Sequence, residues 1–274
     1  MRLLLCRHGE TVGNRQRILQ GQSDGCLTFY GLKQAELLGS RLKSEKFTAV
    51  YVSDLARARQ TAEPIAQYHP YVTPKYDPRL REKHEGILEG KPWGATRVAK
   101  AGSAPKSTRH SGPDGGGESW QDVVNRAESF FHELINCFKH DHDACVLVVS
   151  HGGYLRELIG LILRLGGIDN PPPLLGVRNT ALFEFHIEVM ADATALDECK
   201  QVQVPSSSSG VSGHGQSARA SSGSVQGRID VRILLHNDTE HLRSIGPRDV
   251  SSDEPIVSSS RVPITQFFSP IAKI

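Results

Sequence analysis

The sequence predicts an α/β protein, a three-layer α/β/α sandwich built on a mostly parallel central sheet. Three short apolar runs, at residues 3–6, 49–52 and 146–149, have the composition of fully buried strands. Segments with apolar residues at helical spacing separate these runs, so strands and helices alternate along the chain. Such alternation is typical of βαβ units, in which helices cover both faces of a parallel sheet.

Four long helices are expected between and after these strands. Side chains that accept hydrogen bonds from the first turn of a helix mark the expected starts. Thr28 is expected to cap the first helix, Ser53 or Asp54 the second, and Ser119 the third. The fourth helix is expected from residue 154 to about residue 165.

Three further strands complete the predicted sheet. Residues 71–76 are interrupted by Pro74 and form an edge strand at best, because proline cannot donate to the ladder. Residues 182–189 and 229–235 are expected to pair as a terminal hairpin. The stretch 88–117 is rich in Gly, Pro, Ser and Lys, and an excursion of this length is usually a lid or a substrate loop.

Composition argues against several classes of protein. The 32 Lys and Arg residues nearly cancel the 30 Asp and Glu residues, so the bulk charge indicates no nucleic acid or membrane surface as a partner. Five cysteines without CxxC spacing argue against a disulfide framework and against a zinc site. The chain enters its first strand too early for a signal peptide, and its apolar runs are shorter than the ~20 residues of a membrane span. We therefore expect a cytoplasmic protein without metal or cofactor.

A basic strand end carries the clearest functional signal. Arg7, His8 and Gly9 directly follow the first predicted strand, and ligands of open α/β sheets bind at the carboxyl ends of strands. A guanidinium can bind phosphate with two donors, and a glycine lets a ligand approach the main chain. His151 and Gly152 follow another strand in the same way. If the two strands are neighbours, the two imidazoles share one pocket; two unrelated histidines are the competing interpretation.

These motifs together resemble the signature of the histidine phosphatase (phosphoglycerate-mutase-like) superfamily. The resemblance runs from residue 1 to about residue 190 and includes Arg7-His8-Gly9-Glu10-Thr11, Arg57, Leu80-Arg81-Glu82 and Ser150-His151-Gly152. Within the superfamily, the chain is most similar to the TIGAR-type fructose-2,6-bisphosphatases, through Gln20-Gly21-Gln22, Ser53-Asp54-Leu55 and Gly116-Gly117-Glu118. The resemblance implies a phosphoglycerate-mutase-like fold and an enzyme that acts on a small phosphorylated metabolite.

The resemblance also implies a metal-free mechanism and a role for each residue. His8 would attack phosphorus and become a phosphohistidine, and Glu82 would protonate the leaving alcohol and then activate water. Arg7, Arg57 and His151 would hold the equatorial oxygens. Further donors are expected at Asn14, Gln20, Gly21 and Gly152. Position alone favours another interpretation of Glu82, a surface salt bridge with a neighbouring arginine.

The substrate is less well defined than the reaction, because Glu85 stands where related enzymes often have an aromatic residue. A carboxylate there would repel a second phosphate unless His84 or Lys83 offsets its charge. The excursion 88–117 lacks the paired arginines with which mutases hold a bisphosphate cofactor, which favours hydrolysis. We expect fructose 2,6-bisphosphate as the substrate. The alternatives are a phosphoglycerate mutase, a bisphosphoglycerate phosphatase, and a weakly active regulatory or scaffold protein.

The C-terminal part is expected to divide into three pieces. The catalytic domain would cover residues 1–242, with a disordered Ser/Gly-rich insertion at 206–227, and residues 243–274 would form a flexible tail. Part of this tail resembles the core of the peptide that docks into the replication sliding clamp, and the alternative is that its aromatic rings cover the domain itself. The residues of this resemblance are Ile264, Phe267 and Phe268.

Overall fold

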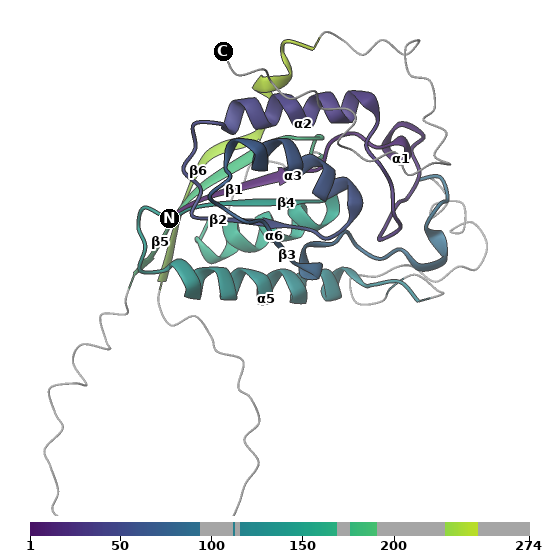
Figure 1. The fold of residues 1–274 in the computed structure, drawn as a ribbon. Coiled ribbons are helices and arrows are strands. Elements are labelled where there is room, and N and C mark those ends of the chain that lie inside the picture. Colours follow the sequence, from purple (N-terminus) through teal and green to yellow (C-terminus); the bar gives the residue numbers. More distant parts are fainter. Residues whose placement is uncertain (94–111, 113–115, 169–175, 191–227, 246–274) are drawn as a thin grey trace, which may run out of the picture.

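A computed structural model describes residues 1–93, 112, 116–168, 176–190 and 228–245. Its centre is a six-stranded sheet in the order β3-β2-β4-β1-β5-β6 (Figure 1). The strands are β1 (Arg2–Arg7), β2 (Ala49–Val52), β3 (Lys75–Tyr76), β4 (Cys145–Ser150), β5 (Leu182–Met190) and β6 (Arg228–Asp238). The first four are parallel, β5 is antiparallel to β1, and β6 is antiparallel to β5. The mostly parallel sheet is therefore confirmed.

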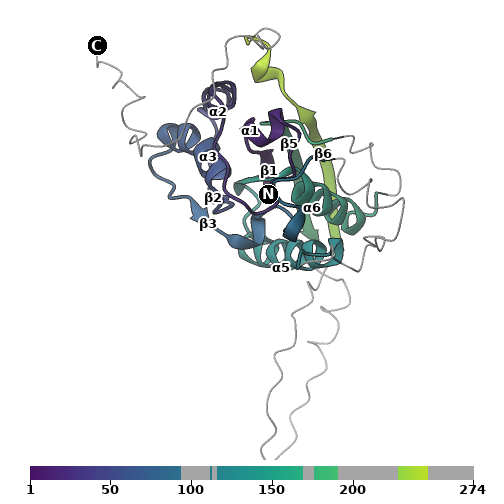
Figure 2. The ribbon, with the colours of Figure 1, turned by 90° about the vertical axis from the view of Figure 1, so that its right-hand side faces the viewer.

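Helices cover both faces of this sheet, as the alternating pattern predicts (Figure 2). The helices are α1 (Val12–Arg15), α2 (Phe29–Leu42), α3 (Ala56–Tyr68), α5 (Trp120–Phe138) and α6 (Gly152–Leu165). Alternate residues of β1 divide between the two faces, because successive side chains of a strand point in opposite directions. Leu3 and Leu5 pack into the core under α5 and α6, whereas Leu4 and Cys6 pack into the core under α2 and α3. None of the helices in the described ranges is long and apolar enough to cross a membrane.

Two of the three predicted helix caps are confirmed. The hydroxyl of Thr28 accepts a hydrogen bond from the first turn of α2, and Ser119 forms a capping box at the start of α5. The prediction for Ser53 and Asp54 is wrong, because α3 begins after Leu55 and has no side-chain cap. The Ser53 hydroxyl instead bonds to His151, and the Asp54 carboxylate accepts from Arg81.

The edges of the sheet follow the predicted pattern. The edge strand with Pro74 shortens to the two residues of β3, and β6 pairs with β5 as a hairpin in which Ile187 lies opposite Val231. Most of the excursion 88–117 lies outside the described residues. So do the predicted insertion at 206–227 and the residues Ile264, Phe267 and Phe268. The domain boundary near residue 242 stays a prediction.

The pairing of β1 with β4 positions the two histidines. Arg7 at the end of β1 lies opposite Ser150 at the end of β4, and the main-chain N–H of His8 donates to the Ser150 carbonyl at 2.9 Å. The two strands run in the same direction, so His8 and His151 leave the sheet at the same carboxyl edge.

Candidate active site

His8 is buried at this edge with one ring nitrogen already bonded. His8 is 2% exposed, and its Nδ1 lies 2.7 Å from the carbonyl oxygen of Gly9. A carbonyl only accepts, so Nδ1 carries the proton of the neutral ring and Nε2 keeps its lone pair. Burial lowers the pKa of His8 well below its ordinary value, and the charges of Arg7 and Arg57 lower it further. The ring is therefore neutral, which is the form that a nucleophile requires.

His151 lies beside His8, with the two ring centroids 5.1 Å apart. Its Nδ1 accepts from Nε of Arg57 at 3.2 Å, because arginine only donates, and its Nε2 donates to the hydroxyl of Ser53 at 2.8 Å. Burial and the charge of Arg57 lower the pKa of His151 well below its ordinary value. Both ring nitrogens thus have protein partners, and direct contact with a phosphate requires the exchange of one of them.

Two guanidinium groups, one on the partly buried Arg7 and one on the buried Arg57, supply positive charge next to His8. Nη1 of Arg7 donates to the carbonyl of Val177 at 2.6 Å, while its buried Nε has no partner among the described residues. Arg57 is 1% exposed and donates to the carbonyls of Ser23 and Gly21 as well as to His151. Burial lowers the pKa of Arg7, and it lowers the pKa of Arg57 to about 10. The negative charge of Glu82 opposes this lowering at both arginines, but burial outweighs it. An anion placed between the two cations would therefore be stabilised.

The carboxylate of Glu82 lies at the start of α6. Its oxygens accept from the main-chain N–H of Gly153 at 2.9 Å, of Tyr154 at 3.1 Å and of Lys83 at 2.9 Å. The N-terminus of a helix carries partial positive charge and unpaired N–H donors, which explains why this carboxylate binds there. The bonds fix the direction of Glu82 relative to the helix that begins directly after His151.

The two arginines that precede Glu82 in the sequence bind other carboxylates. Nη2 of Arg79 lies 2.6 Å from Asp77, and Nε of Arg81 donates to Asp54 at 2.7 Å. Within the part of the chain that the structure describes, neither forms an ion pair with Glu82. The surface salt bridge considered for Glu82 is therefore wrong.

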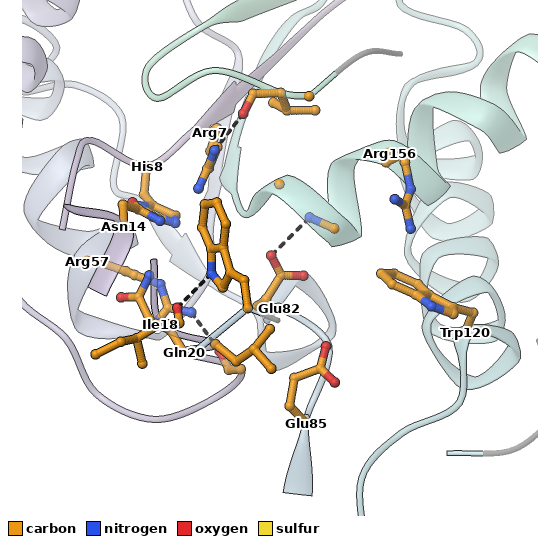
Figure 3. Close-up of a pocket in the computed structure, with 17 residues that line it drawn as sticks. Arg7, His8, Asn14, Ile18, Gln20, Arg57, Glu82, Glu85, Trp120 and Arg156 are labelled. Atoms are coloured by element: carbon orange, nitrogen blue, oxygen red, sulfur yellow. Dashed lines mark hydrogen bonds between the residues drawn. The ribbon is translucent and has the colours of Figure 1, made fainter. Parts of the chain in front are cut away.

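The four predicted donor positions all line one cavity of about 390 Å³, together with Arg7, His8, Arg57 and Glu82 (Figure 3). Asn14 uses its amide oxygen to accept from Asn179, and Gln20 uses its own to accept from Thr11. The NH₂ group of each amide is thus the end that remains to donate. The carbonyl of Gly21 accepts from Arg57, and the Gly21 backbone adopts a positive φ of 50°. Its role as a donor stays a prediction.

The opposite wall of the cavity contains residues that sequence reasoning missed. Figure 3 shows Trp120 and Arg156 on one side of Glu82, with His8 and Arg57 on the other. Cζ of Arg156 lies 4.4 Å from the ring centroid of Trp120. Arg156 follows Gly152 by four residues, about one helical turn, and this spacing places it near the same end of α6. That spacing was the one signal in the sequence that pointed to it.

Glu85 also lines this wall and is paired with a buried lysine. Nζ of Lys83 lies 2.8 Å from the Glu85 carboxylate, and the Lys83 side chain is 4% exposed. The same Nζ lies 5.6 Å from the ring centroid of Trp120. Lys83 therefore offsets the negative charge that made the sequence ambiguous about a second phosphate.

Comparisons with known proteins agree with this geometry. The sequence model of the histidine phosphatase superfamily (branch 1) matches residues 3–191. The chain is 33% identical to the fructose-2,6-bisphosphatase TIGAR of Bos taurus, over 59% of this chain and 76% of that protein. It is 39% identical to a metal-independent phosphoserine phosphatase of Arabidopsis thaliana, over 57% and 66%. A solved mycobacterial glucosyl-3-phosphoglycerate phosphatase is 28% identical with a TM-score of 0.55, over 67% of this chain and 89% of that one.

Proposed function

The chain belongs to the histidine phosphatase superfamily and is a phosphatase, and on this premise we propose that it works without metal through a phosphohistidine on His8. The observation that carries the proposal is the environment of this ring. The Gly9 carbonyl holds the proton on Nδ1, so the lone pair on Nε2 is available at a cavity lined by Arg7 and Arg57. A nucleophile with these neighbours suits a phosphate ester, whose charge the guanidinium groups offset.

The reaction follows in two displacements. Nε2 of His8 attacks phosphorus, the bond from phosphorus to the leaving oxygen breaks, and protonated Glu82 gives its proton to that oxygen. The Glu82 carboxylate then takes a proton from water, the water oxygen attacks phosphorus, and the N–P bond breaks to release phosphate and neutral His8. Arg7 and Arg57 hold the equatorial oxygens in both steps, with Asn14 as a further donor.

Replacement of His8 tests this mechanism. We expect His8→Ala to abolish hydrolysis of 4-nitrophenyl phosphate, and we expect EDTA to leave the rate of the unchanged protein as it is. His132→Ala on α5 is the matched control, because this histidine lies outside the cavity. A phosphoenzyme that is labile in acid and missing from His8→Ala would support the intermediate, whereas a wild-type rate in His8→Ala would contradict the mechanism.

Fructose 2,6-bisphosphate is the substrate that we propose first. The likeness to TIGAR supports it, and so does Arg156, a third arginine that lines the cavity at its far wall. Lys83 reduces the repulsion between Glu85 and a second phosphate. A cytoplasmic location, predicted from the sequence, is compatible with this metabolite.

Phosphoserine is a second candidate, favoured by the same wall. The Glu85 carboxylate can accept hydrogen bonds from the ammonium group of phosphoserine, and Arg156 can donate to its carboxylate. The plant relative named a metal-independent phosphoserine phosphatase supports this candidate. A panel of fructose 2,6-bisphosphate, 2,3-bisphosphoglycerate, 3-phosphoglycerate and phosphoserine, compared by kcat/KM, separates the two and also tests the mutase alternative. If kcat/KM were negligible for all four compounds, the regulatory or scaffold alternative would be favoured.

A further inference from the structure

Arg126 on α5 is bonded through every N–H that an arginine carries. A guanidinium has five such donors in a rigid plane. Nη1 donates to the carbonyls of Arg79 and Arg81, both at 2.6 Å, and Nη2 donates to the carbonyl of Glu82 at 3.1 Å. The other two donors bind the carboxylate of Glu118, from Nε at 2.9 Å and from Nη2 at 3.1 Å.

The three carbonyls belong to the short segment that carries Glu82. This segment begins within a single turn of 3-10 helix, Pro78–Leu80, and belongs to no strand. Its carbonyls therefore need partners from elsewhere in the fold, and Arg126 supplies three of them. The Glu82 side chain is bonded to the start of α6, so its main chain is held by α5 and its carboxylate by α6.

Glu118 extends the same support past Glu82. Its carboxylate accepts from the main-chain N–H of His84 at 2.8 Å, and its own N–H donates to the His84 carbonyl at 2.9 Å. The carboxylate also neutralises Arg126, whose side chain is 15% exposed. The segment is thus fixed before and after Glu82 by one ion pair that does not line the cavity.

We infer that Arg126, together with Glu118, is a positioning residue that holds Glu82 where it can protonate the leaving oxygen. The inference rests on the proposed role of Glu82 as the acid. Proton transfer requires the acid within hydrogen-bond reach of the leaving oxygen, and a misplacement of about 1 Å costs a rate factor on the order of 100. Lysine at position 126 keeps the charge but loses the planar set of five donors.

The dependence of the rate on the leaving group tests this role. Phenyl phosphate needs a proton on its leaving oxygen, whereas 2,4-dinitrophenyl phosphate releases a stable anion that needs none. We expect Arg126→Lys to lower kcat/KM for phenyl phosphate by about tenfold to a hundredfold, and to lower it far less for the dinitrophenyl ester. The ratio kcat/KM reports the first displacement, in which the leaving group departs. Glu118→Gln is expected to shift the same ratio in the same direction.

Two reference variants make the result decisive. Arg79→Lys weakens another link between this segment and α5, the ion pair with Glu133. It leaves the carbonyl bonds to Arg126 in place, so it is expected to affect both esters equally. Glu82→Gln is expected to show the largest selective loss on phenyl phosphate, and the double variant with Arg126→Lys should lose little more. Equal losses on both esters in Arg126→Lys and in Glu118→Gln would overturn the positioning role. Equal losses in Glu82→Gln would instead contradict the proposed acid.

Discussion

The inner end of the cavity and its outer wall are built in different ways. At the inner end, His8, His151 and Arg57 are at most 2% exposed, and each is hydrogen-bonded to main chain or to another site residue. At the outer wall, formed by Trp120, Arg156 and Glu85, the Arg156 side chain is 46% exposed. The inner end is held by strands and helix starts, whereas the outer wall depends on ion pairs and ring contacts.

We expect the inner end to determine the rate of the reaction and the outer wall to determine which substrate is preferred. Substitutions at the inner end leave buried polar groups without partners, which costs both rate and stability. Substitutions at the outer wall affect ion pairs and ring contacts at the rim of the cavity, none of which belongs to the reacting groups. We therefore expect large losses from the inner end and modest changes of preference from the outer wall.

The sharpest test of this contrast is Arg57→Lys. Lysine cannot donate at once to His151, Gly21 and Ser23, so one or more of these groups loses its partner and the phosphate loses a planar cation. We expect kcat/KM to fall by about 100-fold to 1000-fold on every substrate. Arg41→Lys is the control, because Arg41 pairs with Asp238 away from the cavity. A loss that depends strongly on the substrate would break the contrast.

The buried histidines also make a prediction about stability and pH. Their folded pKa values lie well below the ordinary value of 6.5, so below pH 6.5 the unfolded chain binds protons that the folded protein does not. Stability is therefore full above pH 6.5 and falls as the pH drops toward the folded pKa values. Two such groups correspond to a slope of up to about 2.7 kcal/mol per pH unit in the free energy of unfolding.

Denaturation by urea at a series of pH values measures this slope. His8→Gln removes one of these groups and is expected to reduce the slope by about 1.4 kcal/mol per pH unit. An unchanged slope in His8→Gln would show that His8 takes up a proton in the folded protein.

Much of the fold and the inner end could be predicted from local sequence. Buried strands have continuous apolar runs, and the two His-Gly steps follow directly from where such runs end. The partners of Ser53 could not be predicted, because His151 lies 98 residues away in the sequence. The role of Arg126 was hidden for a related reason, since a lone arginine on an amphipathic helix usually faces solvent. Long-range polar pairs have no periodic signal, and they decide where the side chains of the site point.

The outer wall offers the smallest and most specific test, Glu85→Gln. The amide keeps the shape of Glu85 but removes the negative charge that faces a second anionic group of the substrate. The Glu85 side chain is 18% exposed. A unit charge at close range contributes at least about 1 kcal/mol there, a factor of about 5 in kcat/KM.

We expect Glu85→Gln to shift the ratio of kcat/KM for fructose 2,6-bisphosphate over phosphoserine by about this factor toward the bisphosphate. Hydrolysis of 4-nitrophenyl phosphate, which has no second charge, should change little. Glu36→Gln is the control, because Glu36 is also paired with a lysine, Lys33, but lies on α2 outside the cavity. A general loss on all substrates would show that Glu85 is needed for catalysis itself. The contrast between a catalytic inner end and a substrate-selecting outer wall would then be wrong at this residue.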